Sequence, residues 1–309
     1  VTQKEALMLH INTNFNKCKI PIITVMASCS TLALFSYLTY IPNPTFATDG
    51  IINPANTTAR SDTTTDQRTL MNIKYMQQMS DQICTNTKEN KTKQLIDIRD
   101  GKSYWVTKLK DGNCWMTQNL DYDITTTDIA TIQKRVYEDN KCVGWVNDNS
   151  VPQYCDPGNI GSGHSARGNY YSWPAAMNGN TSATGTVQGV CPNGWHLPTS
   201  NTTVKGSFDE LAAAYGATND ASGSTIMRGS PMYFQYSGVA DSGGIHYVGS
   251  NGYYWSSTPG SSAYTFILYL GSSGANPSDG NYRYRGYSVR CLMKTNSDDF
   301  WEPDSLLLD

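Results

Sequence analysis

The residues best suited to chemistry in this chain are six cysteines downstream of an apolar N-terminal segment, Cys84, Cys114, Cys142, Cys155, Cys191 and Cys291. No C-x-x-C pair occurs, and His164, His196 and His246 lack the spacing of zinc ligands, so we expect no metal and no cofactor. An even number of cysteines in an exported chain is typical of disulfides. The sequence leaves their pairing open, although Cys142 and Cys155 flank a short polar loop that suits a local disulfide.

Other residues that could catalyse a reaction do not form a recognisable set. The chain has neither a G-x-S-x-G turn nor an HExxH run. His164 and Ser165 are neighbours in a glycine-rich stretch, which predicts a loop rather than a catalytic triad. Asp97 and Asp100 are better explained as turn residues than as paired catalytic carboxylates. We therefore predict that the protein is not an enzyme.

Tyrosine is the residue type that points to binding. Ten of the twenty tyrosines lie between Tyr233 and Tyr287, a region without lysine. Tyrosine gives a large contact area at low entropic cost, and tyrosine and arginine are enriched at binding hot spots. The alternative is that these tyrosines only cover a sheet. The predicted ligand-binding residues, expected in loops before two late strands, are Tyr233, Tyr236, His246, Tyr247, Asn251, Tyr253, Asn281, Tyr282, Arg283 and Tyr284.

Charge and composition exclude some partners. Charged residues make up 16% of the 309 residues and the net charge is −3, so we expect no nucleic acid partner. The uncharged run 20–41 follows Lys17 and Lys19 and is long enough to span a bilayer. It is either a membrane anchor or a signal peptide cleaved after Thr45-Phe46-Ala47. In both cases we expect an exported domain, anchored at the cell surface or secreted.

Hydrophobic periodicity and turn residues predict an α+β domain with antiparallel strands and two or more helices. The clearest helix is 207–215, with Ser207 as a cap, Glu210 three residues later and Gly216 after its end. We expect loops over 121–168. The other predicted elements are an amphipathic helix over 66–79, a hairpin of 95–98 and 104–109 turned at Asp100-Gly101, a short helix over 171–177, and strands at 253–257, 263–270 and 287–293.

Several motifs occur in a recognisable order. They are GNCWMTQNL (112–120), YYSWPAAM (170–177), CPNGWHLPT (191–199), YWSST (254–258) and GYSVRC (286–291). Together they resemble the Fibrobacter succinogenes major paralogous domain, over roughly residues 93–294. That family is similar to C-type-lectin-like and formylglycine-generating-enzyme-like folds. The resemblance therefore implies such a fold, with surface proteins of unassigned biochemistry as its members.

The resemblance also implies roles for single residues. A disulfide between Cys191 and Cys291 is expected, which leaves Cys84 and Cys114 as a pair. Arg290 is expected to anchor a carboxylate or backbone carbonyls, and the ring of His196 to be satisfied internally. The tryptophans inside the motifs are expected in the core, namely Trp115, Trp173, Trp195 and Trp255.

Two activities of similar folds are not expected here. Formylglycine-generating enzymes use a cysteine pair and a metal near the end of the domain, whereas Cys291 is the only late cysteine and is assigned to a disulfide. The run WVND at 145–148 is similar to the W-N-D calcium ligands of true C-type lectins, but it lies in a loop between two cysteines. Calcium needs six to eight oxygens, so we interpret this run as a solvated polar loop.

The chain is thus expected to be a cell-surface binding or adhesion protein that presents a Tyr/Ser/Gly/Asn-rich face to an extracellular protein or glycan. An enzyme that modifies carbohydrates or sulfatases and a structural envelope protein are the alternatives. The tyrosine-rich region is also similar to the variable region of diversity-generating retroelement targets. The expected organisation is a stub with signal or anchor (1–47), a linker and helix (48–80), the family domain (81–294) and an acidic tail (295–309).

Overall fold

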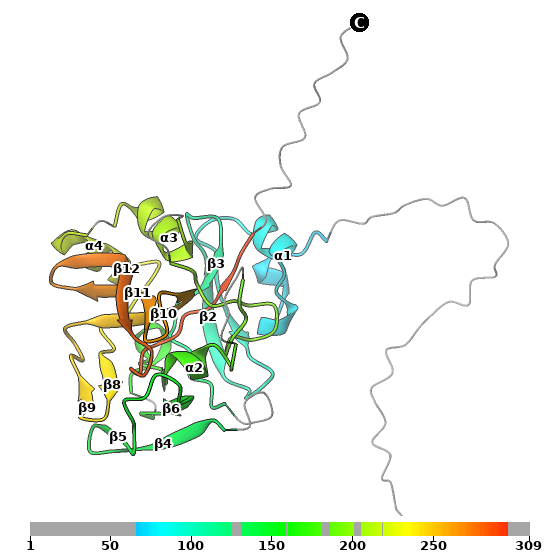
Figure 1. Cartoon of the computed structure of the whole chain (residues 1–309). Helices are drawn as coiled ribbons and strands as arrows, with labels where there is room; N and C mark the ends of the chain where they lie inside the picture. The colour runs from blue at the N-terminus through cyan, green and yellow to red at the C-terminus, as the bar shows by residue number, and fades with distance from the viewer. Residues whose placement is uncertain are drawn as a thin grey trace, which may run out of the picture. The chain divides into compact units, whose positions relative to one another are not determined.

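The computed structural model describes residues 66–124, 131–158, 160–180, 186–200, 205–217 and 219–295 (Figure 1). These residues belong to one compact unit, Asp62–Asp309. The apolar run 20–41 and the tail 296–309 lie outside the described residues. Within the described part, no helix has the length and apolar character needed to cross a membrane.

The segment predicted as one amphipathic helix over 66–79 is instead two 3-10 turns, η1 (Leu70–Asn72) and η2 (Met76–Gln78). The side chain of Asn72 accepts a hydrogen bond from the backbone N–H of Thr69, and that of Gln78 accepts from Lys74 and Tyr75. Such side-chain bonds compete with helix formation. The apolar residues of the predicted helix face are nevertheless all buried, namely Leu70, Ile73, Met76 and Met79. The first regular helix is α1 (Asp81–Asn86).

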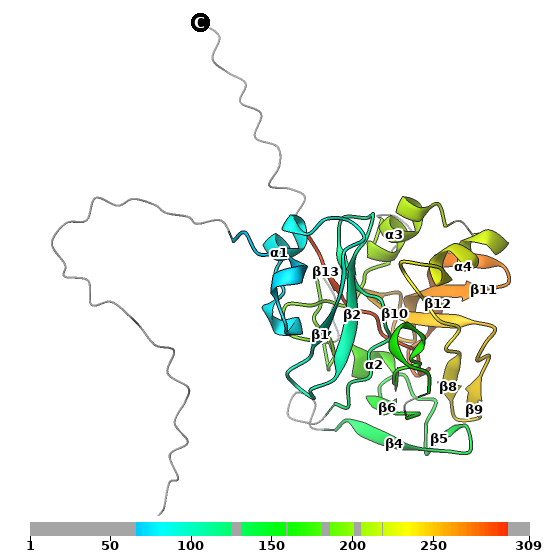
Figure 2. The same cartoon turned by 180° about the vertical axis from the view of Figure 1, so that it is seen from behind.

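A four-stranded antiparallel sheet follows, in the order β1-β2-β3-β13. Its strands are β1 (Thr92–Ile96), β2 (Ser103–Lys108), β3 (Cys114–Met116) and β13 (Leu292–Met293). The predicted hairpin is confirmed, with Gly101 at φ +76°, a conformation that favours glycine. Figure 2 shows the last strand returning beside strands from the start of the domain.

A second antiparallel sheet carries the tyrosine-rich region, in the order β10-β11-β12. Its strands are β10 (Gly252–Pro259), β11 (Tyr264–Gly271) and β12 (Gly274–Tyr282). Helices α3 (Ser207–Tyr215) and α4 (Ala221–Arg228) pack against β12, and α4 also packs against β11 (Figure 1). Apolar residues of this helix layer, such as Phe208 and Met227, pack in one cluster with Tyr254 and Leu268 of the sheet.

Some elements of this region differ from the prediction. Helix α4 and strand β12 were not among the predicted elements, because α4 contains Gly223 and β12 has no apolar alternation. Of the strand predicted at 287–293, only Leu292–Met293 forms β13. Helix α3 is confirmed, but its cap is Gly206, whose N–H donates to Asp209, while Ser207 lies inside the helix. Gly216 ends α3 at φ +67°, as expected.

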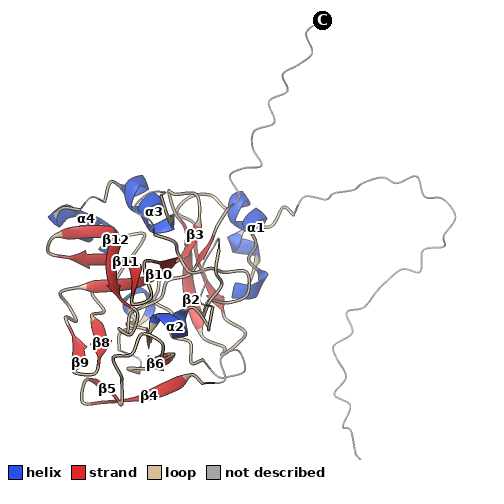
Figure 3. Cartoon of the chain, viewed as in Figure 1, coloured by secondary structure: helices blue, strands red, loops and turns tan. Residues whose placement is uncertain are grey.

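The segment predicted as loops over 121–168 contains three short strands. These are β4 (Gln133–Glu138), β5 (Lys141–Val143) and β6 (Gln153–Cys155), which form a sheet with β7 (Tyr170–Tyr171). Strands β4 and β5 are mostly exposed and lack the apolar alternation that predicts strands, whereas β6 is buried but only three residues long. A separate hairpin consists of β8 (Val239–Asp241) and β9 (Gly244–His246). The short elements η3 (Gly163–Ser165) and α2 (Trp173–Ala176) complete this sheet-rich fold (Figure 3).

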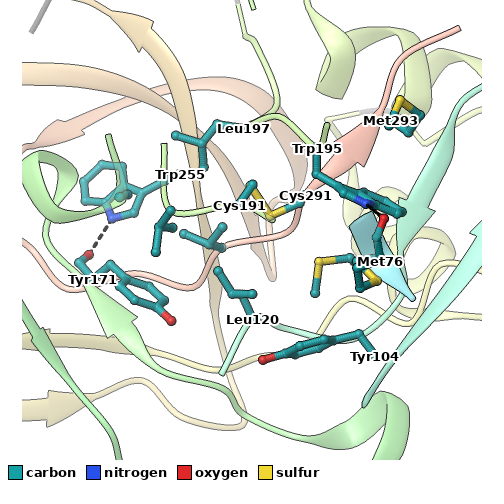
Figure 4. Packing of buried hydrophobic residues seen from close by; sticks show 14 of the residues in the cluster. Met76, Tyr104, Leu120, Tyr171, Cys191, Trp195, Leu197, Trp255, Cys291 and Met293 are labelled. Carbon is teal, nitrogen blue, oxygen red and sulfur yellow. Dashed lines mark hydrogen bonds between the residues drawn. A yellow bond between two sulfur atoms is a disulfide. The ribbon is translucent and has the colours of Figure 1, made fainter. Parts of the chain in front are cut away.

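The four motif tryptophans are all buried, as expected, with at most 2% of each exposed. The indole N–H of Trp195 donates to the carbonyl of Met76 at 2.8 Å, and that of Trp255 donates to Tyr171 at 2.6 Å (Figure 4). A buried indole that keeps a hydrogen bond avoids the cost of an unpaired donor. The tryptophans therefore fix the relative positions of segments far apart in sequence.

All six described cysteines form disulfides, and the pairs match the expectation. They are Cys84–Cys114, Cys142–Cys155 and Cys191–Cys291. Figure 4 shows the last of these inside the core, near Trp195 and Leu197. The ring of His196 differs from expectation, because its Nδ1 is buried without a hydrogen-bond partner. Only the backbone of His196 is paired, through two bonds with Leu292.

Replacing Cys191 and Cys291 together by alanine should lower the free energy of unfolding by about 4–5 kcal/mol, because this disulfide closes a loop of 100 residues. The matched removal of Cys142 and Cys155, which are 13 residues apart, should cost about 3 kcal/mol. Guanidinium unfolding of both variants measures the difference. Equal stability of the Cys191/Cys291 variant and the parent, or a free Cys291 thiol in peptide mapping without reduction, would contradict the assignment.

Candidate functional site

The structure divides the predicted binding residues into exposed and buried ones. Tyr247 is 58% exposed and Tyr282 is 36% exposed, whereas Tyr284 is half-buried. Tyr253 is only 7% exposed, because it lies in β10 with its ring 4.9 Å from that of Tyr287. The assignment of Tyr253 to a binding loop was wrong, and this residue belongs to the core. Asn251 beside it uses its amide group to bind the hydroxyls of Tyr253 and Tyr269.

Three tyrosines, Tyr264, Tyr282 and Tyr284, form an aromatic stack at the end of the second sheet, which we call the tyrosine stack. The ring centroids of Tyr264 and Tyr282 are 4.3 Å apart, and those of Tyr282 and Tyr284 are 5.2 Å apart. Strand pairing places them, since Tyr264 of β11 is directly opposite Tyr282 of β12. A hydrogen bond with Tyr282 raises the pKa of Tyr264. The stack gives a rigid aromatic surface that is open to solvent.

A cavity of about 510 Å³, which we call the Trp173 pocket, has Trp173 and Arg283 in its lining, and none of the three stacked tyrosines is among its described lining residues. Arg283 lies between Tyr282 and Tyr284 in sequence, and its guanidinium lies 4.2 Å above the Trp173 ring. The N–H of Trp173 donates to the carbonyl of Arg283 at 2.9 Å, which ties the start of α2 to the end of β12. Burial lowers the pKa of Arg283. Other residues that line the pocket are Asn147, Asp148, Asn149, Ser150, Pro174, Gly179, Asn180 and Ser262.

The loop 147–150 is held against this pocket by specific bonds. The Asn149 side chain accepts a hydrogen bond from the N–H of Tyr284 at 3.1 Å, and the Trp145 indole donates to the Tyr284 carbonyl at 2.9 Å. Asp148 accepts bonds from the hydroxyl and N–H of Ser150, and these lower the pKa of its carboxyl. The prediction of a solvated polar loop agrees with the exposure of Val146, Asn147 and Asp148. The sequence did not indicate that the bonds with Tyr284 hold this loop against the pocket.

The remaining predicted residues lie in separate places. His246 of β9 is exposed and 3.3 Å from Asp241 of β8, and Tyr247 follows it with a left-handed φ of 61°. Tyr233 stacks on His164 at 4.2 Å beside a cavity of about 430 Å³, and Tyr236 lies under the guanidinium of Arg228 at 3.8 Å. The predicted residues thus form several sites rather than one continuous face.

Arg285 lies between two of these groups. Burial lowers its pKa, but the nearby Tyr287, Tyr284 and Asp241 outweigh this effect and raise the pKa above its usual value. Arg285 is also close enough to Tyr253 to influence its pKa.

Residues considered for catalysis have structural partners. Asp97 is fully buried and forms an ion pair with Arg99 at 2.7 Å. The Nδ1 of His164 is 2.9 Å from the carbonyl of Thr117, and the Ser165 hydroxyl donates to Ser162. Among the described residues, no three His, Cys, Asp or Glu side chains group as metal ligands would.

The motif order agrees with one family, whose sequence model matches residues 111–293. The chain belongs to the Fibrobacter succinogenes major domain family. Its match spans β3 to β13 and includes both the Trp173 pocket and the tyrosine stack. No curated protein and no solved structure matches the chain.

Substitution of single tyrosines by alanine distinguishes a tyrosine of the core from one of the surface. Tyr253→Ala should lower the free energy of unfolding by about 3 kcal/mol or more, because it leaves a cavity against Tyr287. Tyr282→Ala, its matched control, should cost about 1 kcal/mol or less, since an exposed ring loses only stacking contacts and a solvent-exposed hydrogen bond with Tyr264. Urea unfolding followed by intrinsic fluorescence measures both values. A larger loss for Tyr282→Ala than for Tyr253→Ala would overturn the division.

Proposed function

We propose that this protein is an exported cell-surface binding protein whose Trp173 pocket, together with the tyrosine stack, binds an extracellular glycan. The observation that carries the proposal is the convergence of polar groups on one cavity, whose lining residue Arg283 lies between Tyr282 and Tyr284 of the stack in sequence. Amide, hydroxyl, carboxyl and guanidinium groups come from three separate segments, 147–150, 173–180 and 262–283.

The chemistry of the lining favours a sugar over a flat protein surface. Oxygen atoms and N–H groups for hydrogen bonds with sugar hydroxyls come from the lining residues Asn147, Asn149 and Ser150. The volume of about 510 Å³ lies within the range of roughly 300–1,000 Å³ that small-molecule sites occupy. Exposed rings such as Tyr282 can stack on the apolar face of a sugar ring, as aromatic residues do when one side of a ligand is apolar.

The scaffold we propose is C-type-lectin-like. Its support is the Cys191–Cys291 disulfide, which joins the region before α3 to the last strand, as the resemblance implies. Export and attachment through the run 20–41 belong to the same proposal, supported by the disulfides, which persist in oxidising compartments.

A non-catalytic role is part of the proposal. The sulfur of Cys291 is bonded to Cys191 in the core and is fully buried, so it offers no thiol to a formylglycine-generating type of reaction. The alternative function, a structural envelope protein, would not need an ordered pocket. The fixed position of Arg283 over Trp173 supports binding over that alternative.

A screen of neutral glycans against the purified full chain tests the proposal. At least one should bind saturably, and Arg283→Ala should weaken it at least about tenfold, because hydrogen bonds from a charged donor are among the strong ones. Calorimetric titration measures the affinity. Binding of no neutral glycan, or unchanged affinity in Arg283→Ala, would exclude the Trp173 pocket as the site.

Arg228→Ala is the matched control for this titration. Arg228 also lies over an aromatic ring, that of Tyr236 at 3.8 Å, but it does not line the Trp173 pocket. Its removal should leave neutral glycan binding unchanged. Equal losses in both variants would indicate a general effect of removing an arginine.

Sequencing this gene in sister strains tests the similarity to retroelement targets. Substitutions should concentrate at exposed positions such as Tyr247 and Tyr282 and spare buried ones such as Tyr253 and Tyr287, because only exposed changes alter binding without loss of fold. An even spread of substitutions over exposed and buried positions would contradict a diversified binding face.

A further inference from the structure

A second cavity, of about 200 Å³, has a strongly basic lining and lies apart from the Trp173 pocket. Two arginines, Arg167 and Arg228, line it together with Tyr236 and other residues. We call it the arginine cavity. Among the residues that the structure describes, no aspartate or glutamate lines it. The side chains of two arginines therefore border one small cavity, and no carboxylate of the described residues lines it.

Arg167 is fixed with part of its charge unsatisfied. Its backbone is held on both sides, because its N–H donates to Ile160 at 2.9 Å and its carbonyl accepts from Asn119 at 2.9 Å. Its side-chain Nη1 is buried and has no hydrogen-bond partner within the described chain. A buried charged donor without a partner is costly, so a group that supplies oxygen atoms here would stabilise the fold.

Arg228 supplies the second charge from the last turn of α4. Its guanidinium lies 3.8 Å from the centre of the Tyr236 ring, which holds it flat beside the cavity. Across the described residues, neither Arg228 nor Arg167 takes part in an ion pair. Within the described part of the chain, this positive charge therefore has no carboxylate partner.

We propose that the arginine cavity binds an oxyanion, namely a sulfate, phosphate or carboxylate group. Guanidinium forks match the oxygens of these groups, and hydrogen bonds between the two charged partners are short and strong. The volume is below the roughly 300 Å³ at which small-molecule sites begin, so it fits a single anionic group rather than a whole ligand. This site is independent of the proposed neutral-glycan pocket.

Such an anion has two possible sources, a free ion or a substituent on a larger ligand. Titration of the full chain at low ionic strength separates them, because screening by salt is then weak. The probes are inorganic sulfate, inorganic phosphate, glucuronic acid and glucose 6-sulfate, with uncharged glucose as the blank. Tighter binding of the charged sugars than of the inorganic ions would assign the cavity to a ligand substituent, and the reverse order would assign it to a free ion.

Arg167→Gln and Arg228→Gln should each weaken binding of the best anion at least about tenfold, and Arg283→Gln should leave it unchanged. Arg228 is exposed, so we expect Arg228→Gln to fold. This variant therefore tests the proposal even if Arg167→Gln unfolds. Circular dichroism in anion-free buffer checks the fold of each variant.

Absence of saturable binding of every anion, or wild-type affinity in a folded Arg228→Gln variant, would overturn the proposal. Loss of glycan binding in Arg283 variants with intact anion binding would leave this inference standing.

Discussion

The rest of the structure depends on the buried guanidinium of Arg290. Its Nε donates to the Asn119 side chain at 2.7 Å, and its two Nη atoms donate to the carbonyls of Met232 at 2.9 Å and Tyr233 at 2.6 Å. The side chain is fully buried, and this burial lowers its pKa to about 10. A buried cation that lost these acceptors would be strongly destabilising, so they must stay in place. Arg290 thereby ties the last segment to both the first sheet and the turn before β8.

The segment that contains Arg290 connects the core with the candidate binding site. Tyr287 exchanges backbone hydrogen bonds with Tyr171, and Leu292 exchanges them with His196. Cys291, between Arg290 and Leu292, is bonded to Cys191. The same segment begins at Arg283, whose carbonyl accepts from Trp173. One continuous stretch of chain therefore fixes the sheets and presents the guanidinium of the Trp173 pocket.

This arrangement explains which features could be predicted from the sequence. Periodicity and motif order predicted the hairpin at Gly101, helix α3 and the buried tryptophans, because these depend on local pattern or on burial. The pairing of Cys191 with Cys291 came from family resemblance rather than from any local signal. The role of Arg290 in binding backbone carbonyls also followed from its place in the family motif.

The features that were missed depend on contacts between distant segments. Strand β12 has Pro277 and no apolar alternation, and it exists because β11 pairs with it. The residues next to Tyr253 in the sequence are similar to those next to exposed tyrosines, yet the stacking of its ring on Tyr287 buries it. The loop around Asn149 is held at the pocket by bonds to Tyr284, which lies 135 residues after Asn149. No single stretch of sequence contains that information.

The central claim is that the end of the domain forms a sugar-binding pocket at Arg283 and Trp173. A crystal structure of the full chain with its tightest-binding neutral glycan tests it most directly. The account predicts sugar density between Arg283 and the loop 147–150, with a ring stacked on Tyr282 or Tyr284. Sugar bound only elsewhere, such as at the cavity beside Tyr233, would contradict it.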